Sequence, residues 1–128
     1  MGRKIRALIV DDSSVMRKII ERALRQAGLD LETVCEASNG AEALDLLASQ
    51  QVDLILSDIN MPTMDGLEFV RQLQARNLAA KVPVVMITTE SSEEHVKQAI
   101  QAGARGYIRK PFTADHVKER VLPLVGIQ

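Results

Sequence analysis

Acidic side chains that could bind a metal ion or accept a phosphoryl group stand at two places in the sequence. Asp11 and Asp12 directly follow the short run 5–10 (IRALIV), and Asp58 directly follows the run 53–57 (DLILS). Carboxylate oxygens are hard ligands that suit Mg²⁺, and an aspartate can also act as a covalent nucleophile. If the fold brings these three acids together, the sequence predicts metal-assisted phosphoryl chemistry.

Positive charge is needed wherever three carboxylates converge. Two like charges about 4 Å apart repel by about 4 kcal/mol at an effective dielectric constant near 20. Lys110, which ends the short run 106–110 (GYIRK), is one candidate to offset this repulsion, and a divalent cation is the other. Thr88 and Thr89 end another apolar run and add hydroxyl donors that could bind phosphate oxygens.

Each of these residues also has a purely structural interpretation. Asp11 and Asp12 could stabilise the N-terminus of a following helix, and Asp58 could begin a turn. Lys110 could be a solvated surface lysine. All of them stand where an apolar run ends, however, and this shared position favours one common site.

The apolar pattern alternates between strand-like and helix-like segments five times. Strands are expected near 5–10, 33–37, 53–57, 82–89 and 106–110, and helices near 13–28, 39–50, 65–75, 91–103 and 113–125. Helical spacing in the first helix puts seven apolar residues on one face: Val15, Met16, Ile19, Ile20, Ala23, Leu24 and Ala27. Such alternation predicts an α/β fold, a doubly wound parallel sheet with helices on both faces.

The strand order follows from which strands are wholly apolar. The first, third and fourth strands carry few polar residues, whereas the second and fifth contain several, as expected at the edges of a sheet. The leading order is therefore 2-1-3-4-5, which sets the first and third strands side by side. An exchange of the third and fourth strands remains open from the sequence alone.

Composition limits the class of protein. The chain has 128 residues, 46% of them hydrophobic, and a formal net charge of -1, so we expect one globular domain over residues 1–128 with no nucleic-acid or membrane partner. The basic start MGRKIR lacks the apolar stretch of a signal peptide, and a cytoplasmic location is expected. The single cysteine, Cys35, cannot form an internal disulfide.

Four motifs occur in a fixed order: IVDDS, LSDINMPTMDG, VVMITTE and YIRKPFT. Together they resemble the receiver domain of two-component response regulators, of the single-domain CheY-like kind, over essentially the whole chain. The resemblance implies a flavodoxin-like fold and a phosphorylation-dependent signalling switch, with chemotaxis or motility as the expected process. It implies no enzyme activity beyond self-phosphorylation from a phosphodonor and autodephosphorylation.

The resemblance also implies roles for individual residues at the acidic site. Asp58 would be the phosphoacceptor, and Asp12, Asp58 and the backbone carbonyl of Asn60 would hold Mg²⁺, with Asp11 assisting through water. Lys110 would contact the acyl phosphate.

Further roles concern the response to phosphorylation and the shape of the loops. Thr88 would move to hydrogen-bond the phosphoryl group, and Tyr107 would rotate inward as the switch aromatic. The bond before Pro111 would be cis, and Pro62 and Gly66 would shape the loop after the acceptor.

The resemblance implies partners and a lifetime for the phosphorylated form. Asn60 and Glu90 would tune hydrolysis toward a short lifetime. A CheA-like histidine kinase would donate the phosphoryl group, a protein effector would bind the face formed by the fourth helix, fifth strand and fifth helix (residues 92–125), and a phosphatase is a further expected partner. A phosphate sink or phosphorelay intermediate, or a small aspartyl-phosphate hydrolase, is the alternative function.

Overall fold

The computed structural model of the chain describes residues 4–78, 81–89 and 93–126. Within these ranges, five strands alternate with five α-helices and a final 3₁₀ turn. The strands are β1 (Lys4–Val10), β2 (Asp30–Ala37), β3 (Leu54–Ser57), β4 (Val84–Thr88) and β5 (Gly106–Arg109). The helices are α1 (Ser14–Gln26), α2 (Gly40–Leu47), α3 (Gly66–Ala75), α4 (Glu93–Gln101), α5 (Ala114–Val121) and η1 (Leu122–Val125).

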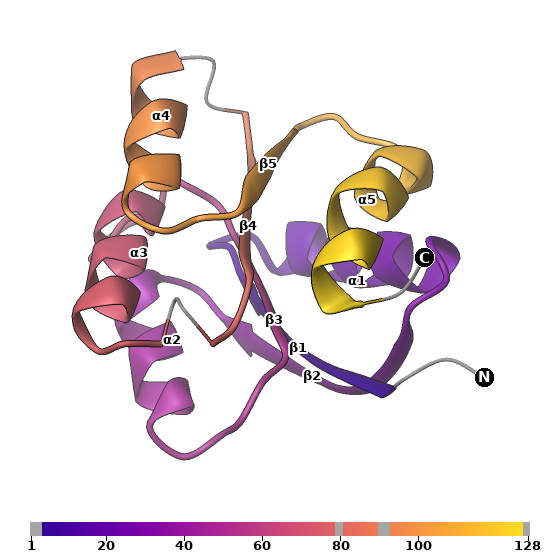
Figure 1. Cartoon of the computed structure of the whole chain (residues 1–128), viewed down its shortest axis with the longest axis horizontal. Helices are drawn as coiled ribbons and strands as arrows, with labels where there is room; N and C mark the ends of the chain where they lie inside the picture. Colours follow the sequence, from indigo (N-terminus) through magenta and orange to yellow (C-terminus); the bar gives the residue numbers. More distant parts are fainter. Residues whose placement is uncertain (1–3, 79–80, 90–92, 127–128) are drawn as a thin grey trace.

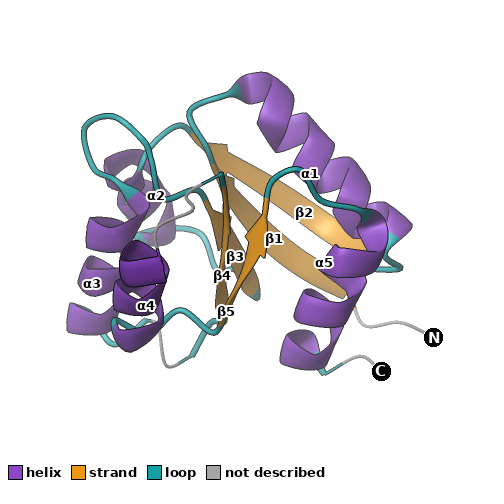
Figure 2. Cartoon of the chain, turned by 90° about the horizontal axis from the view of Figure 1, so that it is seen from above, coloured by secondary structure: helices purple, strands orange, loops and turns teal. Residues whose placement is uncertain are grey.

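The strands form one parallel sheet in the order β2-β1-β3-β4-β5. This order confirms the predicted arrangement and excludes an exchange of β3 and β4. Helices α1 and α5 cover one face of the sheet, and α2, α3 and α4 cover the other (Figures 1 and 2). The connections between strands run over both faces, so the winding reverses between β1 and β3.

Two apolar layers hold the helices to the sheet. Alternate residues of β1 point to opposite faces, so Ile5, Ala7 and Ile9 join the layer under α1 and α5, while Leu8 and Val10 join the layer under α2, α3 and α4. All five side chains are fully buried. Burial on both faces explains why β1, β3 and β4 read as nearly pure hydrocarbon in the sequence.

Some element boundaries differ from those predicted. β2 starts at Asp30, earlier than expected. The last helix, α5, ends at Val121, and the 3₁₀ turn η1, which contains Pro123, follows it directly. Proline has no N–H group for an α-helical hydrogen bond and its ring clashes with the preceding turn, which favours the change to a tighter 3₁₀ turn.

Only part of the predicted apolar face of α1 is buried. Val15 is 68% exposed and Ile19 is 46% exposed, whereas Ile20, Ala23 and Leu24 are buried. A helix that packs on a sheet at one side buries only the stripe that contacts its neighbours. The pattern of apolar residues therefore indicated the helix but overstated the width of its contact.

Among the described helices, none combines the length and the apolar character that crossing a bilayer requires.

Candidate functional site

The carboxyl ends of the adjacent strands β1 and β3 carry the acidic residues. Val10 pairs with Ser57 at the end of the ladder, and the backbone N–H of Asp58 donates to the carbonyl of Val10 at 2.9 Å. On the other side, the N–H of Asp11 donates to the carbonyl of Ala37 in β2 at 3.0 Å. Both aspartates are thus fixed at the sheet edge by main-chain hydrogen bonds.

Three carboxylates converge there, as the strand order predicts. One oxygen from each of Asp11, Asp12 and Asp58 lies within 4.8 Å of the others. Asp11 and Asp58 are buried, with exposed fractions of 1% and 8%, whereas Asp12 is exposed. Two anchored, buried acids and one solvent-facing acid thus form a cluster that is open to water at Asp12.

Main-chain N–H groups orient the two buried carboxylates. Asp58 Oδ1 accepts hydrogen bonds from the N–H of Ile59 at 2.7 Å and of Asn60 at 3.3 Å. Asp11 Oδ1 accepts from the N–H of Ser13 at 2.9 Å. Each carboxylate therefore has one oxygen held by the backbone, and this arrangement fixes the direction of the other.

Lys110 supplies the positive charge at this site. Its Nζ donates to Asp11 Oδ2 at 2.8 Å and to Asp58 Oδ2 at 3.3 Å, and its side chain is only 10% exposed. Its backbone N–H donates to the carbonyl of Thr88 at 2.9 Å, and the Lys110–Pro111 peptide bond is cis, as predicted. One ammonium against three carboxylates leaves a surplus of negative charge.

The donor set fits a hard divalent cation. Mg²⁺ binds oxygen at about 2.0–2.1 Å in octahedral geometry, which puts opposite ligands roughly 4.2 Å apart. Oxygens within 4.8 Å of one another can reach such an ion directly or through one of its waters. The cluster consists only of carboxylates, the ligand type that Mg²⁺ prefers.

The loop between β3 and α3 approaches the backbone of Asp58 so closely that residue 66 must be glycine. The N–H of Gly66 donates to the carbonyl of Ile59 at 2.8 Å, and a Cβ atom at Gly66 would lie 2.0 Å from the carbonyl oxygen of Asp58. Pro62 lies in the same loop, followed by Thr63 with a φ of 67°. Pro62 and Gly66 thus lie in the loop that they were predicted to shape.

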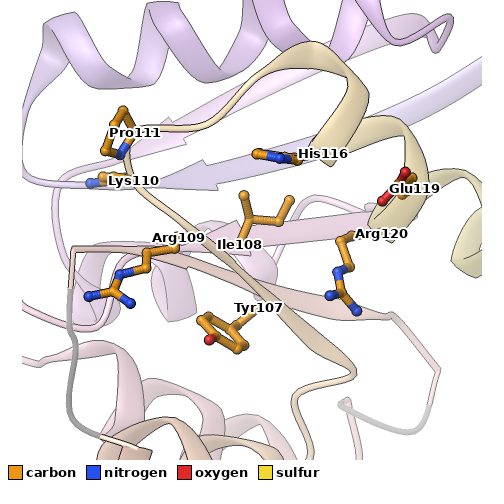
Figure 3. A pocket seen from close by; sticks show the side chains of 8 residues that line it. All are labelled: Tyr107, Ile108, Arg109, Lys110, Pro111, His116, Glu119 and Arg120. Carbon is orange, nitrogen blue, oxygen red and sulfur yellow. The ribbon is translucent and has the colours of Figure 1, made fainter.

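Thr88 and Tyr107 occupy neighbouring strands but differ in exposure. Thr88 ends β4 and is fully buried, whereas Tyr107 in β5 is 38% exposed. A pocket of about 410 Å³ adjoins Tyr107 (Figure 3). β5 and the residues after it form one side of this pocket, and α5 forms the other; the lining residues are Tyr107, Ile108, Arg109, Lys110, Pro111, His116, Glu119 and Arg120. The predicted tuning residue Glu90 lies outside the described residues, so its role stays a prediction.

Arg17 contacts the acidic loop, which sequence reasoning did not anticipate. Its Nη1 donates to the backbone carbonyl of Asp11 at 2.6 Å, and its Nε donates to Glu36 Oε1 at 2.9 Å. The hydrogen bond from Arg17, assisted by Lys18, holds the pKa of Glu36 below its usual range. Because Arg17 and Glu36 are 19 residues apart and meet only across α1 and β2, no local pattern in the sequence indicates the contact.

Gly40 is a second residue near the site that sequence reasoning missed. Its N–H donates to the carbonyl of Met64 at 3.0 Å, and a Cβ atom there would lie 2.9 Å from the side chains of Met64 and Phe69. The pair Asn39–Gly40 could have signalled a helix start with close packing, since Asn39 is the N-cap of α2.

The chain is similar to known signalling domains. Residues 7–122 match the family model described as the response regulator receiver domain. A chemotaxis protein CheY homolog of Campylobacter jejuni is 42% identical over 123 residues, which cover 95% of this chain and 93% of that protein.

Solved structures share the fold over nearly the full length of the chain. The signal receiver domain of the putative response regulator NarL from Mycobacterium tuberculosis has a TM-score of 0.86 and 31% identity, over 99% of this chain and 100% of that one. The chemotaxis response regulator CheY4 of Vibrio cholerae has a TM-score of 0.79 and 33% identity, over 97% and 99% of the two chains.

Proposed function

Because this chain belongs to the response regulator receiver domain family, we propose that it is a phosphorylation-dependent switch whose acceptor is Asp58. The observation that carries this proposal is the convergence of Asp11, Asp12, Asp58 and Lys110 at the carboxyl end of β1 and β3. Asp58 has one oxygen held by two backbone N–H groups and the other within reach of Lys110, which suits it to accept the phosphoryl group.

The proposed step is transfer from a phosphohistidine of a partner kinase. A carboxylate oxygen of Asp58 attacks the phosphorus atom, the O–P bond forms as the P–N bond breaks, and the electron pair stays on the imidazole nitrogen. The N–H groups of Ile59 and Asn60 orient the carboxylate for this attack. Lys110, already 3.3 Å from Asp58 Oδ2, would pair with an oxygen of the phosphoryl group.

Asp11, Asp12 and Asp58, with the backbone carbonyl of Asn60, would hold Mg²⁺ at this site. The ion would neutralise part of the charge on the phosphoryl oxygens. Asp12 is exposed and can turn toward a ligand, whereas Asp11 is held by Ser13 and Lys110 and suits a contact through water.

The phosphoryl group would act on a two-state element formed by Thr88, Tyr107 and the face of α4, β5 and α5. Lys110 links the site to this element, since its N–H is bonded to the carbonyl of Thr88 and its chain continues from β5. Moving such an equilibrium from 1:99 to 99:1 needs about 5.5 kcal/mol. A protein effector that prefers one state would then read the signal.

A chemotaxis or motility role with a CheA-like kinase in the cytoplasm is the process we propose. The similarity to the chemotaxis proteins of Campylobacter jejuni and Vibrio cholerae supports this process. Asn60 is exposed beside the acceptor, a position from which it could influence the approach of water to the acyl phosphate and give a short lifetime.

The test is phosphorylation of the purified protein by acetyl phosphate, read as a mass increase. Wild type with Mg²⁺ should gain one phosphoryl group, while wild type with chelator and the Asp58→Asn variant should gain none. Asp53→Asn is the matched control, because it removes an aspartate at the opposite end of β3 and should leave labelling intact. Equal labelling of Asp58→Asn and wild type would contradict the proposal.

Effector binding has a separate readout. Beryllofluoride, which mimics the phosphoryl group, should change the affinity of the face of α4, β5 and α5 for a partner protein. A phosphate sink would instead show no partner that depends on the state of Asp58, apart from the kinase.

A further inference from the structure

We propose that Arg17 is a positioning residue that holds the peptide between Asp11 and Asp12 and thereby sets the Mg²⁺ affinity of the site. This inference rests on the proposed function, because it assumes that the acidic cluster binds the ion. It assigns a role at the sheet edge to a residue of α1 that carries no carboxylate and lies outside the cluster itself.

The contact is short and sheltered. Arg17 Nη1 donates to the carbonyl of Asp11 at 2.6 Å, and the Arg17 side chain is only 16% exposed. β1 ends at Val10, so the carbonyl of Asp11 lies beyond the strand ladder. The guanidinium supplies a charged donor there, and charge-assisted hydrogen bonds of this kind are roughly twice as strong as neutral ones.

Holding this one carbonyl orients Asp12. The peptide group is planar, so the position of the Asp11 carbonyl also fixes the N–H and the Cα atom of Asp12. Asp12 is the exposed member of the cluster, and its carboxylate makes no hydrogen bond or ion pair with the described part of the chain. Its direction therefore depends on the backbone that carries it, and Arg17 restrains that backbone.

Arg17 is itself anchored from β2. Glu36 Oε1 accepts from Arg17 Nε at 2.9 Å, and Glu36 Oε2 accepts from Lys18 Nζ at 3.2 Å. Arginine can donate from two edges of one rigid plane, so it bridges Glu36 and the Asp11 carbonyl at the same time. A lysine has a single ammonium group on a flexible stem and cannot reproduce that bridge.

Charge and geometry predict opposite effects for Arg17. A positive side chain near a cation site repels the ion, so loss of the charge alone would strengthen Mg²⁺ binding. Loss of positioning would weaken it, because residues that orient metal ligands typically contribute about 10-fold or more to metal affinity. The sign of the change therefore separates the two roles.

The experiment measures Mg²⁺ binding by calorimetry for wild type, Arg17→Gln, Arg17→Lys and Lys18→Gln. Both Arg17 variants should raise the Kd for Mg²⁺ by about 10-fold. Lys18→Gln is the matched control, since Lys18 shares Glu36 but is 70% exposed and does not contact Asp11. It should change the Kd by less than about 2-fold, as expected for a solvated surface charge.

Three outcomes would overturn the inference: an unchanged or lower Kd in Arg17→Gln, full retention of affinity in Arg17→Lys, or an equal loss in Lys18→Gln. If Arg17→Gln does not fold, the Mg²⁺ affinity of Arg17→Lys alone tests the inference. The failure of the proposed function looks different, because wild type itself would then bind no Mg²⁺. In that case, amide hydrogen exchange at Asp12 and Ser13 tests whether Arg17 restrains this backbone. Faster exchange in the Arg17 variants than in wild type supports the positioning role, and unchanged exchange contradicts it.

Discussion

The two ends of the strand pair β1 and β3 both carry ion pairs, but the pairs differ in charge balance. At the amino end, Arg6 of β1 meets Asp53, which directly precedes β3. The guanidinium of Arg6 donates from Nε to Asp53 Oδ2 at 3.1 Å and from Nη2 to Asp53 Oδ1 at 3.2 Å. The backbone N–H of Arg6 also donates to Asp53 Oδ2, at 2.9 Å. Asp53 raises the pKa of Arg6, chiefly through the side-chain hydrogen bond, and in this contact one guanidinium faces one carboxylate.

At the carboxyl end, the same strands present three acids to a single lysine. Lys110 contacts Asp11 and Asp58, and Asp12 remains exposed beside them. The acids of this cluster exceed its one cation by two charges, a surplus that a divalent cation can neutralise. The pair at the amino end thus joins two strands, whereas the cluster at the carboxyl end keeps negative charge that the chain's own lysine does not neutralise.

The largest effect should come from removing the only cation of the carboxyl-end cluster. Lys110→Met leaves the buried acids Asp11 and Asp58 without their partner, and we expect the free energy of unfolding without Mg²⁺ to fall by about 4 kcal/mol. Added Mg²⁺ should restore more stability to this variant than it adds to wild type. Urea denaturation with and without the ion measures both effects.

Arg6→Met is the corresponding change at the amino end. Arg6 is 37% exposed and Asp53 keeps the backbone N–H as a donor, so the loss should be much smaller than that of Lys110→Met and independent of Mg²⁺. If both variants lost the same stability and responded equally to the ion, the contrast between the two ends would be wrong.

An intermediate effect should come from adding a side chain at Gly66, where the loop after β3 passes close to the backbone of Asp58. Gly66→Ala would place Cβ 2.0 Å from the carbonyl oxygen of Asp58, so the loop must move. We expect a loss of about 2 to 3 kcal/mol in stability and slower labelling by acetyl phosphate, measured by urea denaturation and mass spectrometry.

Gly106→Ala provides the control at the amino edge of the sheet. Nothing lies within 4 Å of a Cβ atom at Gly106, and the stability should stay within about 0.5 kcal/mol of wild type. A Gly66→Ala variant as stable and as rapidly labelled as Gly106→Ala would show that the loop tolerates displacement.

The smallest effect on stability should come from Glu36, the residue of β2 that binds Arg17, and it should depend on pH. The folded-state pKa of Glu36 lies below its usual value, first because of the hydrogen bond from Arg17. Glu36 therefore stabilises the fold above its unfolded pKa, and this contribution disappears as the pH falls through the folded pKa. Because Glu36 is partly exposed, Glu36→Gln should cost only about 0.5 kcal/mol near neutral pH.

The measurement is the difference in unfolding free energy between wild type and Glu36→Gln over a series of pH values. The difference should be constant near neutral pH and vanish in acid. In an Arg17→Gln background the difference should become smaller, because only Lys18 then still pairs with Glu36. A difference that grew as the pH fell would contradict the assigned sign.

Much of the fold could be predicted because the sheet is buried on both faces. The apolar runs of β1, β3 and β4 identify these as central strands and leave β2 and β5 as edges, which favoured the observed order but left an exchange of β3 and β4 open. The width of the contact of α1 could not be predicted, since Val15 and Ile19 follow the helical period but face solvent. Helical periodicity shows which side chains share a face, but not how much of it a neighbour covers.

The acids and the lysine of the site could be predicted for the same reason. Each stands at the end of a strand, and parallel strands bring their carboxyl ends to one edge. The contribution of Arg17 could not be predicted, because its two partners, Asp11 just after β1 and Glu36 in β2, meet it only after α1 has packed across the sheet.

The amino-acid sequence alone indicated the two edge strands, the residues at the carboxyl ends of the strands and the excess of negative charge among them. It favoured the order 2-1-3-4-5 but left an exchange of the third and fourth strands open. These follow from burial and from the type of each residue, which are local properties of the chain. Only the tertiary structure decided which oxygens Lys110 contacts, that residue 66 must lack a side chain, and that Arg17 holds the Asp11 carbonyl. Those contacts join residues far apart in the chain, and their distances depend on how helices and loops pack against the finished sheet.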